Sequence, residues 1–461
     1  MIETVNTTST AMYIERVREY NRNKSMRVYV FTFGCQQNEA DAEKLRGMAH
    51  GMGYSDCDCA EDADLILINT CAIREHAELK ALSMLGRFKA LKKKNPDLII
   101  GVCGCMAAEA HRATLIKEDF HYVSFTLEPN MLHRMPELVC AYMEKRQRRF
   151  ILGEDRGDIV EGMPIRRTHR HRAFVSIMYG CNNFCSYCIV PYVRGRERSR
   201  ASADVIRECR ELINDGVREI TLLGQNVNSY RSDMDFASLI SAIAMIEGDF
   251  IIRFMTSHPK DTSDALIAAM AEHRGKIAPY FHLPLQAGSD RVLKAMNRTY
   301  TSEKYLDTLH RLKSAVPDIA ISTDIIVGFP GEDDEDFEAT MRILADEEFD
   351  MVYAFLYSER EGTRAASMEP KVARDVKDER IARLLEQQDA ISYKKNERFL
   401  GKSCRVLVDS IETRDGKVVY TGRNAENKLV HFTADYAEIG EFINVKIEKT
   451  GAFDLIGCAE K

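Results

Sequence analysis

Between residues 174 and 355, six short apolar runs recur, and each of the first five is followed by a stretch with helical periodicity. Parallel strands are joined by crossovers that usually contain a helix, so this alternation predicts a parallel sheet. Six such units indicate a partial barrel, because a complete eight-fold barrel needs two more. The expected strands lie near Phe174–Met178, Glu219–Leu223, Phe250–Phe254, Tyr280–Leu283, Ile319–Ile326 and Met351–Phe355.

A second strand–helix pattern precedes this barrel. Strands are predicted at Arg27–Phe33, Asp64–Thr70, Asp97–Cys103 and around His121–Leu127, followed in part by helical patterns at Asn38–Met52, Glu75–Lys94 and Asn130–Lys145. We therefore expect a small open α/β domain over residues 27–148. Residues 1–26 are predicted to be a polar leader with a helix near Met12–Tyr20.

The last sixty or so residues have a different character. After a helical run at Val376–Phe399, short alternating segments are separated by Gly, Asn and Asp turns, which predicts a small all-β barrel over residues 399–461. A basic linker at 149–172 and the partial barrel at 173–398 complete an α/β chain of 461 residues. No apolar run approaches the length of a membrane span and no secretory signal is evident, so we expect a cytoplasmic protein without membrane contacts.

Thirteen cysteines in such a chain indicate metal or catalytic use, since the cytosol keeps thiols reduced and an odd number cannot pair completely. Cys35 and Cys71 follow the first two expected strands, and Cys105 lies just beyond the third. Carboxyl ends of neighbouring parallel strands meet at one crevice, which predicts a shared metal site; burial as small apolar residues is the alternative. Cys103 competes with Cys105, but Cys103 lies inside the strand, which favours Cys105 at the turn.

Three further cysteines, Cys181, Cys185 and Cys188, follow the first barrel strand with the spacing C-x₃-C-x₂-C. Active sites of such barrels lie at this end of the strands. A zinc site would need a fourth Cys or His nearby, and none occurs in the next twenty residues. An iron–sulfur cluster with one open iron fits better. The other cysteines are expected to be ordinary residues rather than ligands, and only for Cys57 and Cys59 does a further role stay open.

This spacing, with Tyr187 before the last cysteine, resembles the radical S-adenosylmethionine (SAM) superfamily. The segments "TFGCQQNEADAE", "INTCAIREHAE" and "GCMAAEA" resemble the three cysteine motifs of the methylthiotransferase amino-terminal domain. "FHLPLQAGSDRVLKAMNRTYT" and "STDIIVGFPGE" match the barrel of the same family, and the terminal β-barrel resembles its TRAM domain. Together these cover nearly all of the chain from Arg27 onward. Gln37 and Ala287 are mild departures from the family pattern.

The resemblance implies two [4Fe–4S] clusters, each with one open iron. Cys181, Cys185 and Cys188 (the barrel triad) would hold the catalytic cluster that binds SAM, and Cys35, Cys71 and Cys105 (the auxiliary triad) a cluster that presents sulfur. SAM would serve as methyl donor to that sulfur and as the source of a 5′-deoxyadenosyl radical. "LLGQNVNSYR" and "MNRTYT" resemble the members that insert a methylthio group at carbon 2 of N6-isopentenyladenosine in the tRNA anticodon stem-loop. An electron donor protein, of the flavodoxin or ferredoxin type, and a sulfur source are implied partners.

Polar residues at the ends of the barrel strands are candidate SAM contacts, because a polar group in an apolar strand is costly to bury without a partner. They are Gln225, Asn226, His282, Gln286, Ser322 and Asp324, together with Tyr187 beside the cluster. Internal hydrogen bonding is an equal alternative for Ser322 and a weaker one for Asp324. The turn "GFPGE" is followed by acids that would repel phosphate, so we expect a tight turn there.

Basic residues indicate nucleic-acid contacts despite a net charge of −7. In an extended segment, the arginines of "RGRERSR" would all lie on one side: Arg194, Arg196, Arg198 and Arg200. Their uses stay open between tRNA phosphates and, for Arg194 and Arg196, SAM or cluster charge; a solvated charge run is the simplest alternative. The TRAM resemblance implies RNA contacts at Arg423, Asn424 and Lys428.

Two other functions remain open. A sibling methylthiotransferase would act on N6-threonylcarbamoyladenosine in tRNA or on an aspartate of a ribosomal protein, and "GQNVNSY" disfavours the latter. The other is a non-catalytic iron–sulfur RNA-binding protein. Two triads that each leave an iron open argue against it, because a structural metal site favours closed coordination.

Overall fold

The computed structural model describes residues 8–72, 75–153, 159–414 and 416–460. The chain forms two compact units. The first contains Met1–Thr168, Met178–Asn182 and Cys188–Arg198, and the second contains His169–Ile177, Asn183–Tyr187 and Ser199–Lys461. Residues 1–7 of the expected leader, 73–74 of "INTCAIREHAE" and 154–158 of the expected linker lie outside the described residues. No helix in the described ranges is long and apolar enough to cross a membrane.

The first unit contains a six-stranded parallel sheet with the order β2-β1-β3-β4-β5-β6. Its strands are β1 (Arg27–Thr32), β2 (Ser55–Asp56), β3 (Leu65–Thr70), β4 (Ile99–Gly104), β5 (Phe125–Leu127) and β6 (Arg149–Phe150). The four predicted strands are confirmed. The sequence did not predict β2 and β6, because each strand has only two residues and so shows no alternation of apolar and polar side chains. Since β6 pairs with β5, the first residues of the expected linker belong to the sheet.

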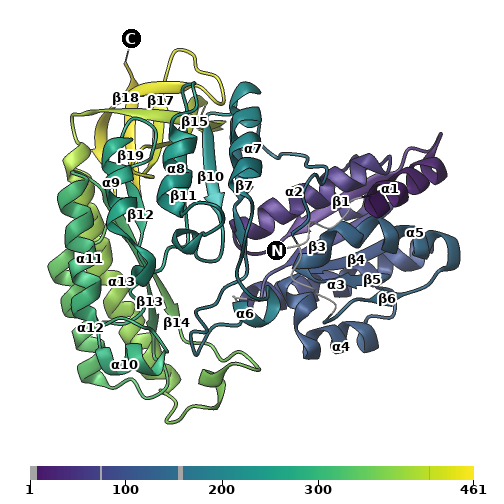
Figure 1. The fold of residues 1–461 in the computed structure, drawn as a ribbon, viewed down its shortest axis with the longest axis horizontal. Helices are drawn as coiled ribbons and strands as arrows, with labels where there is room; N and C mark the ends of the chain where they lie inside the picture. The colour runs from purple at the N-terminus through teal and green to yellow at the C-terminus, as the bar shows by residue number, and fades with distance from the viewer. Residues whose placement is uncertain (1–7, 73–74, 154–158, 415, 461) are drawn as a thin grey trace. The chain divides into compact units, whose positions relative to one another are not determined.

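Helices cover both faces of this sheet (Figure 1). They are α1 (Thr8–Asn21), α2 (Gln36–Gly51), α3 (Glu75–Lys94), α4 (Ala110–Asp119) and α5 (Met135–Lys145). Alternate residues of β3 enter two cores: Leu67 packs with α1, α2 and α5, and Ile68 packs with α3 and α4. Ile14 and Val17 of α1 are buried in the first core. The leader expected to stand outside the domain is therefore, over α1, part of its core.

The second unit contains the six predicted barrel strands. They form two parallel groups, β11-β10-β7 and β12-β13-β14. The strands are β7 (Arg172–Ser176), β10 (Glu219–Leu223), β11 (Ile251–Phe254), β12 (Tyr280–His282), β13 (Ala320–Val327) and β14 (Met351–Leu356). Helices of the connections are α7 (Ser202–Asn214), α8 (Phe236–Ala244), α9 (Asp264–Glu272), α10 (Asp290–Ala295), α11 (Ser302–Ala315) and α12 (Asp334–Glu347), and α13 (Arg374–Asn396) follows β14. The polar strand ends named above are therefore divided between two parallel groups, with Gln225 and Asn226 after β10 and His282, Ser322 and Asp324 on β12 and β13.

The terminal segment forms the predicted all-β barrel, closed in the order β15-β16-β17-β19-β18. Its strands are β15 (Ser403–Arg414), β16 (Lys417–Asn424), β17 (Leu429–Thr433), β18 (Phe442–Thr450) and β19 (Asp454–Ala459). Buried polar contacts join it to the α/β barrel within the same unit. Arg253 of β11 donates to the Asn424 carbonyl (2.7 Å), and Lys428 pairs with Asp350 (3.2 Å). The two barrels are thus fixed together rather than joined only by α13.

Candidate metal centres

The structure brings the auxiliary triad together at the carboxyl ends of three adjacent strands. Cys35 follows β1 at the N-cap of α2, Cys71 follows β3, and Cys105 begins the short helix η2 (Cys105–Ala108) after β4. Burial raises the pKa of the Cys105 thiol to about 12; nearby Arg194 opposes this rise, and Cys71 and Cys35 add to it. Cys71 and Cys35 are therefore close enough to Cys105 to influence its charge. The competitor Cys103 points into the core from β4.

Two glycines allow the loops of this site to approach each other. Gly34 has a φ of +138°, and a Cβ atom there would lie 2.7 Å from the Cβ of Cys71. Gly104 has a φ of +95°, and a Cβ atom there would collide with the carbonyl oxygen of Thr70. A side chain at either position would force the cysteine-bearing loops apart.

Two asparagines that the sequence analysis missed hold these loops in place. Asn38 donates to the carbonyl of Thr70 (2.9 Å), and its Oδ1 accepts from the Cys35 thiol (3.3 Å). Asn69 donates to the Asn38 carbonyl (2.6 Å). The available signal was Asn69 itself, a polar residue inside the apolar strand "LILINT".

Arg194 lies beside the auxiliary triad and is only 3% exposed. Its Nε donates to the Sγ of Cys105 (3.1 Å), and its Nη2 pairs with Asp41 (2.9 Å). The preceding helix α6 (Val190–Val193) contributes Val193 to a small apolar cluster that includes Cys105. Arg194 therefore cannot serve as an exposed RNA contact, and the alternative of pairing with cluster charge is favoured.

The condition under which the four arginines would share one side is not met in the structure. Gly195 has a φ of +73° and turns the chain, so the segment is not extended. Only Arg196 is exposed, whereas Arg198 and Arg200 are buried. Arg200 pairs with Glu208 (2.7 Å) inside the second unit. Among the four, Arg196 alone keeps the surface position that a phosphate contact requires.

Backbone and side-chain contacts fix the loop that carries the barrel triad. The backbone N–H of Cys181 donates to the Gly195 carbonyl (3.2 Å). On the barrel side, Ser186 donates its backbone N–H to Met296 (2.9 Å) and its hydroxyl to the Ala295 carbonyl (2.9 Å). The Tyr187 ring, a candidate SAM contact, packs edge-on against Phe329. The two bonds of Ser186 tie this residue to the end of α10 and to the residue that follows it.

Arg298 is a functional candidate that the sequence analysis did not single out. Its Nη1 donates to the Sγ of Cys185 (3.3 Å), its Nε donates to the Tyr300 hydroxyl (3.0 Å), and its Nη2 donates to the Pro284 carbonyl (3.3 Å). Burial and the charge of Arg298 lower the pKa of nearby His258 to about 2, so this imidazole stays neutral. The motif "MNRTYT" contained Arg298, but nothing in the sequence indicated which cysteine it would meet.

Three of the candidate SAM residues meet on β12 and β13. His282 Nδ1 lies 2.9 Å from the Ser322 hydroxyl, and His282 Nε2 lies 3.5 Å from Asp324 Oδ2. Tyr280 shares a 2.6 Å hydrogen bond with the same hydroxyl of Ser322. Ser322 is fully buried, and its hydroxyl has partners from the protein. The internal role that the sequence left open for Ser322 is therefore favoured.

The other polar strand ends differ in how far the protein satisfies them. Asn226 donates to Asp261 (2.7 Å), but its Oδ1 is buried and has no hydrogen-bond partner among the described residues. Gln286 has a left-handed backbone (φ of +74°) and lies at a bridge to Ile325. Gln225, beside Asn226, is partly exposed. An unpaired buried oxygen such as that of Asn226 is the kind of group that a ligand donor would satisfy.

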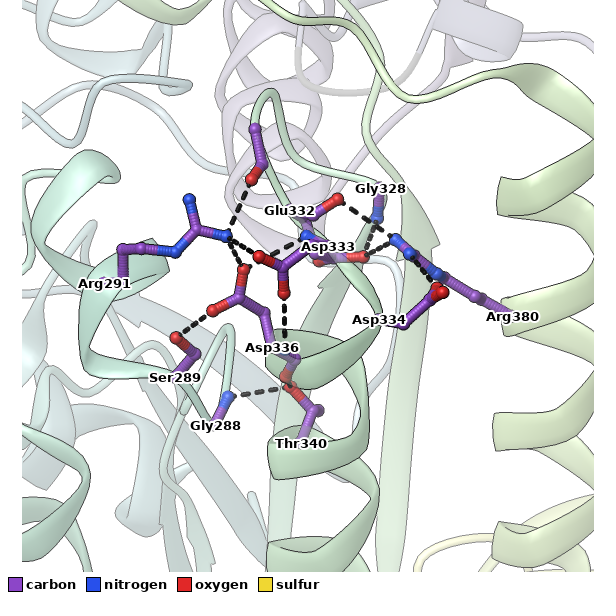
Figure 2. Close-up of polar contacts among 11 residues, drawn as sticks. Gly288, Ser289, Arg291, Gly328, Glu332, Asp333, Asp334, Asp336, Thr340 and Arg380 are labelled. Atoms are coloured by element: carbon purple, nitrogen blue, oxygen red, sulfur yellow. Dashed lines mark hydrogen bonds and ion pairs between the residues drawn. The ribbon is translucent and has the colours of Figure 1, made fainter.

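The segment "GFPGE" forms the tight turn that the sequence predicts (Figure 2). Glu332 accepts from the Gly328 backbone N–H (2.9 Å) and pairs with Arg380 (2.8 Å). Asp333 and Asp336 form a capping box at the start of α12. Protein carboxylates thus occupy the helix N-terminus that a phosphate would otherwise use.

Two of the three predicted RNA contacts in the terminal barrel are wrong. Asn424 and Lys428 are buried, and Lys428 pairs with Asp350 (3.2 Å). Burial lowers the pKa of Lys428, while Asp350 opposes that change. Both residues belong to the junction between the two barrels. Arg423 is partly exposed and donates to the Asn427 carbonyl (3.0 Å), so it remains a candidate.

Within the described ranges, no three Cys, His, Asp or Glu side chains are arranged to hold a single metal ion. An iron–sulfur cluster spreads its thiolate ligands over separate iron atoms, so its ligands need not surround one common ion. Three thiols with an N–H donor to sulfur at Cys105, and a second donor at Cys185, are the chemistry that clusters use. The residues present therefore fit iron–sulfur clusters.

Comparison with known proteins identifies the families that two parts of the chain match. Residues 175–344 match the radical SAM superfamily, and residues 27–126 match a family described as "Uncharacterized protein family UPF0004". A relative from Alkaliphilus oremlandii, named tRNA-2-methylthio-N(6)-dimethylallyladenosine synthase, is 48% identical over 96% of this chain and 95% of its own length. Relatives of the same name from Thermoanaerobacter sp. (46%) and Acetivibrio thermocellus (47%) also cover 96% of this chain, and 95% and 94% of their own lengths.

Solved structures share the fold. The radical SAM methyltransferase TsrM from Kitasatospora setae, with cobalamin and a [4Fe–4S] cluster bound, matches with a TM-score of 0.54 and 12% identity over 74% of this chain and 77% of its own. The cobalamin-dependent SAM radical enzyme OxsB matches with a TM-score of 0.50 and 11% identity over 81% of this chain and 57% of its own. At these identities the likeness shows the architecture alone.

Proposed function

The chain belongs to the radical SAM methylthiotransferase family, and we propose that it inserts a methylthio group at carbon 2 of N6-isopentenyladenosine beside the tRNA anticodon. The observation that carries this proposal is the near-complete overlap with its relatives: 48% identity extends over 96% of this chain and 95% of the relative. A shared radical SAM domain alone would leave the substrate open, because one fold hosts many chemistries. Here the region before the barrel and the region after it are shared as well.

Radical SAM membership implies SAM and one [4Fe–4S] cluster. Cys181, Cys185 and Cys188 would hold this cluster, whose reduction supplies the electron that cleaves SAM. The chain's own part is to orient and shield the cofactor. Arg298 donates to the sulfur of Cys185, and the unpaired oxygen of Asn226 offers a hydrogen-bond acceptor at the end of β10.

The second cluster is part of the proposal. Three thiols at adjacent strand ends, beside a buried arginine that donates to one of them, support a [4Fe–4S] cluster at Cys35, Cys71 and Cys105. It would present the sulfur that is methylated and transferred. A non-catalytic iron–sulfur protein would have no need of two sites of this kind.

We also propose the remaining partners and the domain limits. The anticodon stem-loop would contact exposed Arg196 and partly exposed Arg423. An electron donor protein and a sulfur source would be separate partners in the cytoplasm. The functional divisions are residues 27–148, 173–398 and 399–461. The ends of the first division shift in the structure, since α1 joins its core and β6 its sheet.

Nucleoside analysis tests the substrate. In a strain that lacks the gene, digested tRNA should lose the methylthio-isopentenyl nucleoside and accumulate its isopentenyl precursor, and this chain should restore it. The matched control is the same chain with Cys185→Ala, which should not restore it. Persistence of the nucleoside in the deletion strain, or loss of the threonylcarbamoyl derivative instead, would contradict the assigned substrate.

A further inference from the structure

In each predicted cysteine triad, an arginine donates a hydrogen bond to a sulfur atom. Arg194 Nε lies 3.1 Å from Cys105 Sγ, and Arg298 Nη1 lies 3.3 Å from Cys185 Sγ. Cluster potentials respond to net charge and to hydrogen bonds at sulfur. Both arginines are therefore placed to influence the electron affinity of whatever these thiolates hold.

The two arginines differ in how their charge is balanced. Arg194 pairs with Asp41 at 2.9 Å, and the two residues are only 3% and 2% exposed. Arg298 has the neutral Tyr300 hydroxyl and Pro284 carbonyl as its other partners, and no carboxylate among the described residues pairs with it. The positive charge near Cys105 is thus largely offset, whereas the one near Cys185 is not.

We propose that this difference sets the reduction potentials of the two clusters apart, with Arg298 favouring reduction of the SAM-binding cluster. In that step one electron passes from an external low-potential one-electron donor to the cluster, and no bond forms or breaks. The cluster and its thiolates become more negative, so an unbalanced cation beside them stabilises the reduced state. At the auxiliary cluster, Asp41 cancels most of this effect. The inference rests on the two-cluster function proposed above.

The test is a potentiometric titration, followed by electron paramagnetic resonance, of anaerobically reconstituted full-length protein without SAM. Alanine at all three auxiliary cysteines isolates the barrel cluster. In this background, Arg298→Gln should lower the ratio of reduced to oxidised cluster about tenfold at a fixed potential, a shift of about 59 mV for one electron. Arg298→Lys keeps the charge and should stay close to its parent. The matched control Arg274→Gln removes an exposed arginine that, among the described residues, donates to the Ala315 carbonyl alone, and it should leave the potential unchanged.

The auxiliary cluster gives an independent test of opposite sign. With the barrel cysteines replaced by alanine, Asp41→Asn leaves the charge of Arg194 unbalanced and should raise the reduced fraction, whereas Arg194→Gln should lower it. The Asp41 variant leaves the contact between Arg194 and Cys105 in place, so it stays informative if the Arg298 variant loses its cluster. An unchanged potential in Arg298→Gln, a tenfold fall in Arg298→Lys, or a lower potential in Asp41→Asn would overturn the inference. Iron content distinguishes a failure of this inference from a failure of the two-cluster function. About four irons in the parent protein would overturn the two-cluster function itself.

Discussion

Replacing Asp350 with asparagine tests how the terminal β-barrel is held. Asp350 directly precedes β14 and is only 2% exposed. Its carboxylate accepts from the Ile321 backbone N–H (3.1 Å) and forms ion pairs with Lys428 (3.2 Å), Arg398 (3.3 Å) and Lys395 (3.4 Å). One carboxylate thereby connects β13, the end of α13 and the turn between β16 and β17.

The expected loss follows from the burial of the partners. Removing one member of a buried ion pair costs about 3–5 kcal/mol, because the other charge stays buried without compensation. Lys428 is buried and loses the charge of Asp350, although its hydrogen bond to the Asp350 backbone carbonyl (3.3 Å) remains. Lys395 and Arg398 are partly exposed and regain water. Asparagine can still accept from Ile321. We therefore expect Asp350→Asn to destabilise the junction by about 3 kcal/mol.

Acid should have the same effect as the substitution. Burial alone would raise the pKa of Asp350, but Lys428, Lys395 and Arg398 hold it below its usual range. A carboxyl group with a lowered folded pKa stabilises the protein fully above the unfolded pKa of about 3.9. That contribution is lost as the pH falls through the folded pKa. The acid-dependent part of the loss should therefore be smaller in Asp350→Asn.

Hydrogen exchange at β16 and β17 measures the junction directly, and urea unfolding of the second unit measures its free energy. The matched control is Asp389→Asn, at an exposed position on α13, which should match the parent protein. If Asp350→Asn unfolds within about 0.5 kcal/mol of the parent, and exchange at β16 and β17 is unchanged, the ion pairs contribute nothing and the reasoning is refuted.

Three further predictions, two of them with a matched control, address the cluster site and the RNA surface. Cys105→Ala should reduce bound iron from about eight atoms to about four in reconstituted protein, whereas Cys103→Ala should keep about eight; equal losses would contradict the choice of Cys105. Gly34→Ala should also reduce bound iron to about four atoms, because its Cβ would lie 2.7 Å from that of Cys71. In the control Gly86→Ala, the new Cβ on α3 meets nothing within 4 Å, so the protein should keep its full iron and become about 0.5–1 kcal/mol more stable. Arg196→Ala should weaken tRNA binding about equally for modified and unmodified anticodon loops and reduce its salt dependence, and an unchanged salt slope in filter binding would remove Arg196 from the RNA surface.

The sequence predicted the fold well where the physical signal is local. Apolar runs joined by helical periods identify parallel strands, and a cysteine directly after such a run must lie at a strand end. The choice of Cys105 over Cys103 needed only the rule that side chains inside a central strand are buried. In the structure Cys103 lies in the core and Cys105 at the turn, and the choice between them as a ligand stays a prediction. Strands of two residues, β2 and β6, gave no such signal.

The sequence failed where a side chain's role depends on a distant partner. Lys428 appeared to be a surface cation because its partner, Asp350, is far away in the chain and becomes its neighbour only through the fold. Arg194 depends in the same way on Asp41. The alternation of arginines also assumed an extended backbone, and the left-handed Gly195 removes that assumption. Charge patterns show where charges occur, but not which of them remain available to a ligand.

Two polar residues at the strand ends, Ser322 and Asn226, differ in whether the protein satisfies their hydrogen-bonding groups. We expect this difference to distinguish a cofactor contact from a structural one. The Ser322 hydroxyl has protein partners in Tyr280 and His282, whereas the buried Oδ1 of Asn226 has none among the described residues. Leaving a buried acceptor unpaired costs about 1–3 kcal/mol, which a bound donor would recover. Asn226→Ala should therefore weaken SAM binding about tenfold, beyond the stability lost with its hydrogen bond to Asp261, while Ser322→Ala should lower stability and leave SAM affinity within about twofold. Equilibrium dialysis with reconstituted protein measures the affinities, and the opposite ranking would place the cofactor's hydrogen bonds on β13 instead of at the end of β10.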